Sequence, residues 1–548
     1  MRTVRSFRLQ WFLILAAVTA ACLPPVIFED GTAIAAPRRQ QAKKKAKPKP
    51  KLPDLKTPED KLKFLAIIRG QFPAVRIGRT STFTSEDLDD SLERYVARGT
   101  STPFARIVDD ETFLRRVKID LTGTVPTRQE IKTFVDDPDP KKRSKMIDEL
   151  LDSDAWARKW AKYWRSAVFY NSDAPNSMVN RQAFEDWLFE EFKSDAPWDR
   201  IVAEMISASP KRVRERKAQE NGWQQDYGPN NFILACERKP EIIASNAARL
   251  FMGISIGCAE CHDHPFDQWS REQFHELAAF FAPGKYYMTD EFDPTEKSVV
   301  PARFLLGEQP PASLKPDQRR VAVAAYLIYN PDNYWFARAY VNRMWNELIG
   351  DGFYSVDSLG PDKEVMHKLV VNRLAATFRY AAFDVKWFFR TICNSRTYQR
   401  EIRTIEKDRD LFTAVRPARL RPYEVAASTR QLLGQDRNIE RTINRVFDAD
   451  PSVPQRDLEG SMQQALLFMN NGAIQRRLAG SGLKKQLAKI KSDEQLVREA
   501  FLGVLARSPN ERELKRYTSY LGRVQNRNEA IDDILWVLFN SAEFITKR

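Results

Sequence analysis

The sequence predicts a mainly α-helical protein, with two helical domains that follow a signal peptide and a disordered basic linker. Glycine is scarce, with 21 in 548 residues, and apolar residues recur at spacings of three and four along much of the chain. Capping patterns stand at the start of several of these periodic segments. The sequence has no series of short alternating strands and turns, as a β-sandwich would require. A chain of this length also exceeds one ordinary core, so more than one domain is expected.

The first 36 residues have the layout of an export signal. Three arginines within the first eight residues are followed by an apolar stretch at 11–21, and Ala33–Ala35 has the small-x-small pattern that signal peptidase cuts after. We therefore expect export to the periplasm or the cell surface. The alternatives are lipidation at Cys22, which would leave a lipid anchor, and an uncleaved signal that serves as an anchor. No later stretch is long and apolar enough to span a bilayer, so no transmembrane span is expected in the mature protein.

Residues 37–60 are expected to form the basic linker. The run from Arg38 to Lys51 holds eight basic residues and no acidic residue, among Ala and Pro, and such a run cannot fold alone. A solvated tether is the simplest interpretation. The functional alternative is adhesion to an anionic envelope polymer or to lipid head groups. Export makes a nucleic-acid partner a poor match, so none is expected.

Beyond the linker, residues 61–310 and 311–548 are the two expected helical domains. Residues 184–192 predict an amphipathic helix, because their large apolar side chains fall on one side. Capping-box spacing is found where Thr127 precedes Glu130 and where Ser270 precedes Gln273.

Two stretches rich in turn-forming or charged residues interrupt the helical pattern. The first, 283–318, is rich in Pro, Gly and charge and contains the expected boundary between the domains. The second, 436–458, contains Pro451 and Pro454 and predicts a surface loop.

The residues best suited to chemistry lie in one run, Cys258-Ala259-Glu260-Cys261-His262. Two thiols separated by two residues can each form a thioether to one haem vinyl group, and the adjacent imidazole is then presented to the iron. The run therefore predicts a covalent haem c on Cys258 and Cys261, with His262 as an axial ligand. Haem of this type is attached outside the cytoplasm, which agrees with the export signal.

Two other interpretations of this run remain open. One is a zinc or iron site, since nitrogen and sulfur donors suit these metals. Its candidate ligands are Cys258 and Cys261 with His262 or His264, joined by Asp263, Asp267 or His275. The other is a structural disulfide between Cys258 and Cys261, or a pair of free thiols.

The sixth ligand of a haem iron is not determined by the sequence. The candidates are a histidine on the helix expected after Ser270, a second histidine and two methionines: His275, His367, Met252 and Met288. A single helical histidine is more often structural, and iron without a strong sixth ligand is open to small molecules. Cys236 and Cys393 form either a pair or two buried thiols.

No other enzyme motif stands out. The sequence has no glycine-rich phosphate loop, no nucleophile elbow and no His-Glu-x-x-His run. The catalytic residues are therefore unassigned.

The cysteine run and its surroundings resemble a known family. The segments Phe251–Ile254 and Cys258–Trp269 closely resemble the signature of the planctomycete secreted cytochrome-type domain, also called domain of unknown function 1549. Earlier segments resemble its opening and its middle helices: Phe113–Val117, Asp120–Gly123, Trp156–Trp164 and Trp187–Ile201. The second half is similar to the partner domain, domain of unknown function 1553, in four segments: Asn330–Arg338, Val341–Trp345, Asn394–Gln399 and Asn540–Phe544.

The resemblance implies a secreted protein of poorly known activity, associated with haem chemistry and polysaccharide use. Many relatives carry a further N-terminal cytochrome domain, and here only the basic linker stands in its place, so a separate redox partner protein is expected. The expected function is that of an exported haem c protein with a redox or electron-transfer role, linked to polysaccharide metabolism. The alternatives are a metal-dependent hydrolase at the Cys/His cluster and a non-catalytic envelope- or glycan-binding protein.

Overall fold

The computed structural model describes residue 55 and residues 57–70, 83–99, 102–175, 178–210, 214–216, 224–293, 295–357, 365–404 and 411–547. The predicted signal peptide and most of the predicted linker lie outside these ranges. The segment Pro53–Arg548 forms one compact unit.

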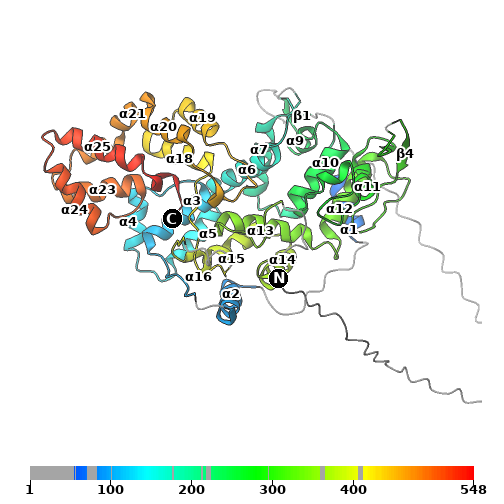
Figure 1. The fold of residues 1–548 in the computed structure, drawn as a ribbon, viewed down its shortest axis with the longest axis horizontal. Helices are drawn as coiled ribbons and strands as arrows, with labels where there is room; N and C mark the ends of the chain where they lie inside the picture. Colours follow the sequence, from blue (N-terminus) through cyan, green and yellow to red (C-terminus); the bar gives the residue numbers. More distant parts are fainter. Residues whose placement is uncertain are drawn as a thin grey trace, which may run out of the picture. The chain divides into compact units, whose positions relative to one another are not determined.

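Helices dominate this unit and confirm the mainly α fold (Figure 1). Up to residue 281 the helical elements are α1 (Pro58–Arg69), α2 (Ser85–Gly99), α3 (Asp110–Thr122), α4 (Arg128–Asp136), α5 (Lys142–Leu151), α6 (Asp154–Phe169), α7 (Arg181–Lys193), α8 (Trp198–Ile206), α9 (Asn230–Ala235), α10 (Pro240–Ala247), η1 (Ala248–Met252), η2 (Gly257–Glu260), α11 (Arg271–Ala278) and η3 (Ala279–Phe281). None of the helices in the described ranges is long and apolar enough to cross a bilayer.

The second half of the chain continues in the same way. Its helical elements are α12 (Pro316–Tyr329), α13 (Trp335–Ile349), α14 (Lys368–Tyr380), α15 (Val385–Asn394), α16 (Arg396–Gln399), α18 (Pro422–Leu433), α19 (Arg437–Val446), η4 (Gln455–Asp457), α20 (Met462–Asn470), α21 (Gly472–Ala479), α22 (Gly482–Leu487), α23 (Asp493–Leu505), α24 (Glu511–Leu521), α25 (Arg527–Phe539) and η5 (Ala542–Ile545). The strands form two antiparallel hairpins, β1 (Arg214–Arg216) with β2 (Gln224–Asp226) and β3 (Tyr286–Thr289) with β4 (Lys297–Val300).

Several local predictions are confirmed. Helix α7 buries the apolar face that its sequence predicts. Both capping boxes are formed, with Thr127 and Glu130 at the start of α4 and Ser270 and Gln273 at the start of α11.

The two stretches predicted as irregular contain regular structure. In 283–318, Tyr286 of β3 pairs with Val300 of β4 and both are buried. These strands of four residues are too short for an alternating pattern to be recognised. In 436–458, helix α19 forms because Asp436 caps its first N–H groups while Ile439 and Ile443 are buried, so the predicted loop is wrong for 437–446.

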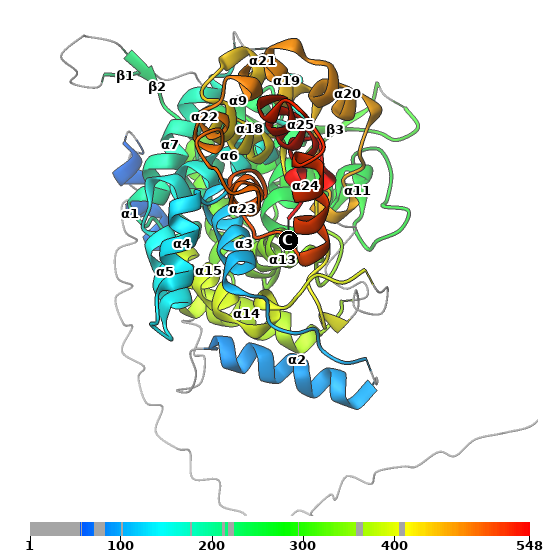
Figure 2. The same cartoon turned by 90° about the vertical axis from the view of Figure 1, so that its left-hand side faces the viewer.

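Buried apolar side chains form two cores. The first extends from Phe64 to Phe412 and the second from Leu420 to Phe544, with a few side chains taken from outside each range. Helices α18 to α25, yellow to red, form the second core on the left of Figure 1 and lie together in Figure 2 as well. The domain boundary at 310/311 stays a prediction, and Phe304 and Val321 on its two sides share the first core.

Six buried charged side chains link elements of both cores: Asp120, Lys159, Glu347, Arg421, Glu424 and Lys547. The Nζ of Lys547 lies 2.5 Å from Asp120 Oδ1, and the Nζ of Lys159 lies 3.0 Å from Glu424 Oε1. Arg421 pairs with Glu347 at 2.5 Å. Burial alone would lower the pKa of Lys547, but the charges of Asp120, Glu424 and Glu347 raise it. Three cations and three carboxylates thus compensate one another in the interior.

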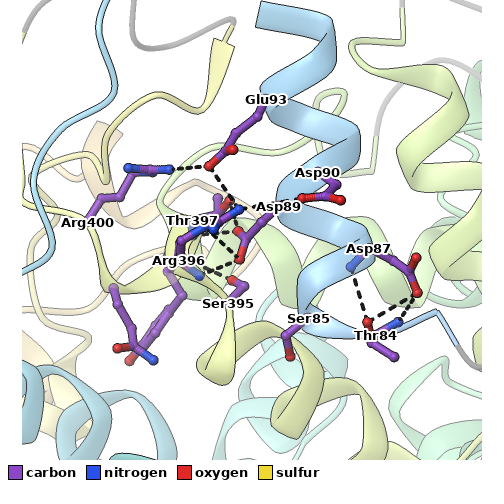
Figure 3. Close-up of polar contacts among 12 residues, drawn as sticks. Thr84, Ser85, Asp87, Asp89, Asp90, Glu93, Ser395, Arg396, Thr397 and Arg400 are labelled. Atoms are coloured by element: carbon purple, nitrogen blue, oxygen red, sulfur yellow. Dashed lines mark hydrogen bonds and ion pairs between the residues drawn. The ribbon is translucent and has the colours of Figure 1, made fainter.

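Helix α2 is attached to the first core through carboxylates on one of its faces (Figure 3). Asp89, only 3% exposed, accepts hydrogen bonds from the backbone N–H groups of Arg396 at 2.7 Å and Thr397 at 2.9 Å. It also accepts a bond from the Thr397 hydroxyl at 2.8 Å. One turn later, Glu93 accepts a bond from Arg400 at 2.9 Å. The carboxylate of Asp89 therefore satisfies the first N–H groups of α16.

We expect Asp89→Ala to lower the free energy of unfolding by about 2–4 kcal/mol, because three donors, two of them buried, lose their acceptor. The matched control is Asp90→Ala, whose carboxylate is 54% exposed and makes only long ion pairs. It should change stability by no more than about 0.5 kcal/mol. Urea unfolding followed by circular dichroism measures both, and equal effects would contradict the role assigned to Asp89.

We expect Lys547→Met to destabilise the protein by about 3–5 kcal/mol, because Asp120 is left as an uncompensated buried charge. Adding Asp120→Asn should recover part of this loss. Urea unfolding of the two single variants and the double variant measures their coupling. Strictly additive effects would show that the pair does not interact, and Lys491→Met serves as the exposed control.

Candidate functional site

The chain approaches the cysteine run through an irregular helix. Helix α10 passes directly into the π-helix η1, which ends at Gly253 in the left-handed conformation, with φ +67°. A Cβ at Gly253 would lie 3.3 Å from the Cβ of Ala339 in α13. Glycine therefore allows both the turn and the close approach to α13. Single π turns often accompany functional sites.

The two motif cysteines lie on the short 3-10 helix η2 and directly after it. Ala259 between them is completely buried, and its N–H donates to the carbonyl of Ile256 at 2.9 Å. Cys258 and Cys261 are both exposed, and their thiols are free. The turn is therefore held from the inside and presents both thiols outward.

The other two cysteines of the described ranges are separate buried thiols, which decides between the two predicted alternatives. Burial raises the pKa of Cys236 to about 12. Burial likewise raises the pKa of Cys393, so neither thiol is a reactive group.

His262 is exposed, and one of its ring nitrogens is engaged. Its Nδ1 lies 2.7 Å from the carbonyl oxygen of Asp263. A carbonyl only accepts, so Nδ1 carries the proton and donates. In the neutral ring the lone pair is then on Nε2, the tautomer that suits a metal ligand whose other nitrogen is fixed by a backbone carbonyl.

His264 is arranged differently and is only 6% exposed. Its ring nitrogen Nδ1 accepts a hydrogen bond from the backbone N–H of Phe266 at 3.2 Å. The backbone N–H of His264 donates to the carbonyl of Trp269 at 2.8 Å. The neutral ring therefore carries its proton on Nε2, which is buried without a partner among the described residues. Asp267, half-buried, accepts a bond from the neighbouring N–H of Gln268.

His275 of α11 points back at the cysteine turn. Its Nε2 lies 2.9 Å from the carbonyl oxygen of Glu260, and its Nδ1 lies 2.7 Å from the hydroxyl of Tyr286. That hydroxyl donates to Glu241 at 2.7 Å. Burial is the main cause that lowers the pKa of His275. Because both ring nitrogens are engaged, this side chain supports the turn, and its role as an iron ligand stays a prediction.

Acidic side chains lie close to His275 and the cysteine turn. Burial first, and then the charge of Glu241, raises the pKa of Glu260. The backbone N–H of Arg271 donates to Asp263 at 2.8 Å, which connects the start of α11 to the residue after His262.

The predicted metal ligands are not brought together. Within the described part of the chain, no group of three or more His, Cys, Asp or Glu side chains is placed to hold a metal ion. Two of the other candidates for a sixth ligand, Met252 and His367, are engaged elsewhere. The sulfur of Met252 lies 3.7 Å from the amide nitrogen of Asn333, and the ring of His367 packs between Tyr95 and Phe412.

A polar cavity of about 670 Å³ lies beside η1. Arg249 of η1 lines it and pairs with Asp357 at 2.9 Å, and Ser452 donates to the same carboxylate at 2.5 Å. Burial alone would raise the pKa of Asp357, but Arg343 and Arg249 lower it. These contacts connect η1 to the loop after α13.

Comparison with family models agrees with the order of the two halves. The model PSCyt2, a protein of unknown function (DUF1549), matches residues 87–286. The model PSD1, a protein of unknown function (DUF1553), matches residues 319–435. The chain contains a PSCyt2 domain followed by a PSD1 domain. Searches of curated proteins and of solved structures gave no significant match.

The cysteine turn and its support belong to the PSCyt2 domain, whereas α13, against which Gly253 packs, belongs to the PSD1 domain. Sequence reasoning missed the roles of Glu241 and Tyr286. They lie 17 residues before and 28 residues after Cys258, and no spacing rule connects a Glu, a Tyr and a His that meet through the fold. The crowding of aromatic residues after the motif was the only available signal.

We expect His275→Leu to loosen the cysteine turn of the PSCyt2 domain. Loss of a hydrogen bond worth about 1–1.5 kcal/mol should increase the rate of amide hydrogen exchange in 257–262 by about tenfold. The rate at which Cys258 and Cys261 are alkylated should change together with this exchange rate. The matched control is His367→Leu, at another buried histidine, which should leave exchange in 257–262 unaffected. Unchanged exchange in His275→Leu would contradict the supporting role.

Proposed function

We propose that the PSCyt2 domain carries one covalent haem c on Cys258 and Cys261, with His262 as an axial ligand. The exported protein would then exchange electrons with a separate redox partner. The name of the family model, PSCyt2, is consistent with a cytochrome-like domain. Export and a link to polysaccharide metabolism remain implications of the sequence and of the resemblance.

The observation that carries the proposal is the hydrogen bonding and exposure of the His262 ring. Its Nδ1 is committed to the Asp263 carbonyl, so Nε2 is the available nitrogen of an exposed ring. Directly before it stand two free, exposed thiols. The donor set therefore fits a c-type haem: two thiols for the vinyl groups and one imidazole with the required tautomer.

Each residue of the turn has a distinct part in this proposal. Cys258 and Cys261 would hold the group covalently, and His262 would bind its iron. When bound, a haem supplies a one-electron couple whose potential depends on the axial ligands and on burial. His275 and Ala259 keep the turn in place from the protein side. Exposure of the thiols and of His262 leaves this face accessible to a partner protein.

A hydrolase centred on zinc or iron is a weaker candidate. It would need His264 as a ligand, but Nδ1 of His264 is occupied by the N–H of Phe266 and its Nε2 is the protonated nitrogen. Among the described residues of the cysteine turn, no specific contact favours a non-catalytic envelope- or glycan-binding role for this site.

We expect protein that has been exported in the presence of a cytochrome c maturation system to contain about one haem per chain. The pyridine haemochrome spectrum should show a thioether-type band that persists after denaturing electrophoresis. Cys258→Ala and Cys261→Ala should each remove or shift this band, because each removes one thioether. Cys393→Ala, at a buried thiol outside the motif, is the matched control and should retain it.

A colourless protein would contradict the proposal, provided that a control cytochrome matures in the same cells. Stoichiometric zinc in that colourless protein, lost in His262→Ala, would favour the hydrolase instead.

A further inference from the structure

Helix α20 is apolar on two opposite sides. Its inner face is anchored by Phe468, whose ring packs against Phe447, Phe539 and Phe544. Its outer face carries three large apolar side chains that are strongly exposed: Met462 (78%), Leu466 (45%) and Met469 (40%). Their spacing of four and three places them on one stripe.

This stripe is unusual for a helix in water. Helix α20 contains no charged residue, and its polar side chains are two glutamines and one asparagine. A surface helix ordinarily shows charged or polar residues on its outer face, and a helix that is apolar all round is normally covered. The outer face of α20 therefore fits an apolar environment better than water.

Arginines are carried by the two helices next to α20. Helices α19, α20 and α21 are neighbours along the upper edge of the unit in Figures 1 and 2. Gln464 of α20 donates to the carbonyl of Val446, the last residue of α19, at 3.4 Å. The exposed face of α19 carries Arg437, Arg441 and Arg445 at intervals of four residues.

These arginines are not neutralised by the acids around them. On α19 and just before it, Glu440 pairs with Arg430 and Asp436 pairs with Arg477. Arg437, Arg441 and Arg445 form no ion pair within the described ranges, and α21 adds the exposed Arg476. The exposed acids of the adjoining loops are Asp448, Asp457 and Glu459, of which Asp457 is paired with Arg456. Unpaired cations thus outnumber unpaired carboxylates on this face.

We propose that α20 docks on an anionic lipid surface, with Met462, Leu466 and Met469 inserted at the boundary between head groups and acyl chains. The arginines of α19 and α21 would contact the anionic head groups. One of these contributions alone gives only marginal membrane binding, whereas an apolar contact together with a basic patch gives stable binding. The basic run of residues 38–51 would add attraction to the same kind of surface.

Other binding partners would account for only one of the two features of this face, the arginines and the apolar stripe. A purely anionic polymer accounts for the arginines but not for the apolar stripe. A second copy joined through the same face would bring its arginines against those of the first copy, which is unfavourable. A lipid surface accounts for both features.

The test is co-sedimentation of the purified protein with two kinds of vesicle, phosphatidylcholine alone and an equal mixture with phosphatidylglycerol. We expect binding to the mixed vesicles that weakens with salt, and little binding to phosphatidylcholine. The combined variant Met462→Ser, Leu466→Ser and Met469→Ser should bind at least about tenfold more weakly. The combined variant Arg437→Glu, Arg441→Glu and Arg445→Glu should also lose binding.

The matched control replaces exposed apolar residues elsewhere, Phe292→Ser with Leu369→Ser, which are 90% and 80% exposed. This control should bind like the unchanged protein. All variants are checked for an unchanged circular dichroism spectrum and unfolding midpoint, which is expected because the altered side chains are exposed.

Three results would overturn the proposal. The first is the absence of binding to mixed vesicles. The second is equal binding by the unchanged protein and the triple Ser variant, which would assign the binding to the basic run or to another surface. The third is a change of oligomeric state in the triple Ser variant without any vesicle binding, which would make a second copy the occupant. None of these results depends on whether haem is attached.

Discussion

The arrangement of the chain depends on the buried charges around Asp120. This residue lies near the end of α3, between Ile119, which belongs to the second core, and Leu121, which belongs to the first. Its carboxylate binds Lys547 and accepts a bond from Tyr398 at 2.7 Å. Lys159 donates to the carbonyls of Ile119 and Asp120 and so holds the end of the same helix. Buried ion pairs add little net stability, but a wrong arrangement leaves charges unpaired. We infer that this cluster selects one way of joining the two cores.

The same cluster is connected to the cysteine turn through α13. Glu347 near the end of this helix pairs with Arg421, whereas Ala339, about 12 Å earlier along the axis at 1.5 Å per residue, packs against Gly253. Gly253 ends the π-helix that leads into the motif. The surface that shapes the PSCyt2 turn is therefore supplied in part by the PSD1 domain. This contact joins the two domains at the segment that leads into the turn.

Features that depend on near neighbours could be predicted from the sequence, and features that depend on distant contacts could not. The capping boxes at Thr127 and Ser270 and the apolar face of α7 were predicted correctly, because each is determined within one or two helical turns. Helix α19 was missed because two prolines after it suggested a loop, although the cap at Asp436 was visible. At the site, the exposed Cys-x-x-Cys-His run was identified, but the meeting of Glu241, Tyr286 and His275 required the fold.

The four histidines have separate tasks, which bears on the chemistry of the proposed haem. His275 has both ring nitrogens engaged, and His264 has its Nδ1 occupied and its ring buried. His367 packs among aromatic rings at the start of α14. Only His262 has an exposed ring with a defined available nitrogen. If haem is bound as proposed, His262 would supply one imidazole to the iron, whereas the other three histidines are buried. Because iron with one strong protein ligand is open to small molecules, a small ligand would be able to reach the iron of the proposed haem if His262 were its one strong ligand.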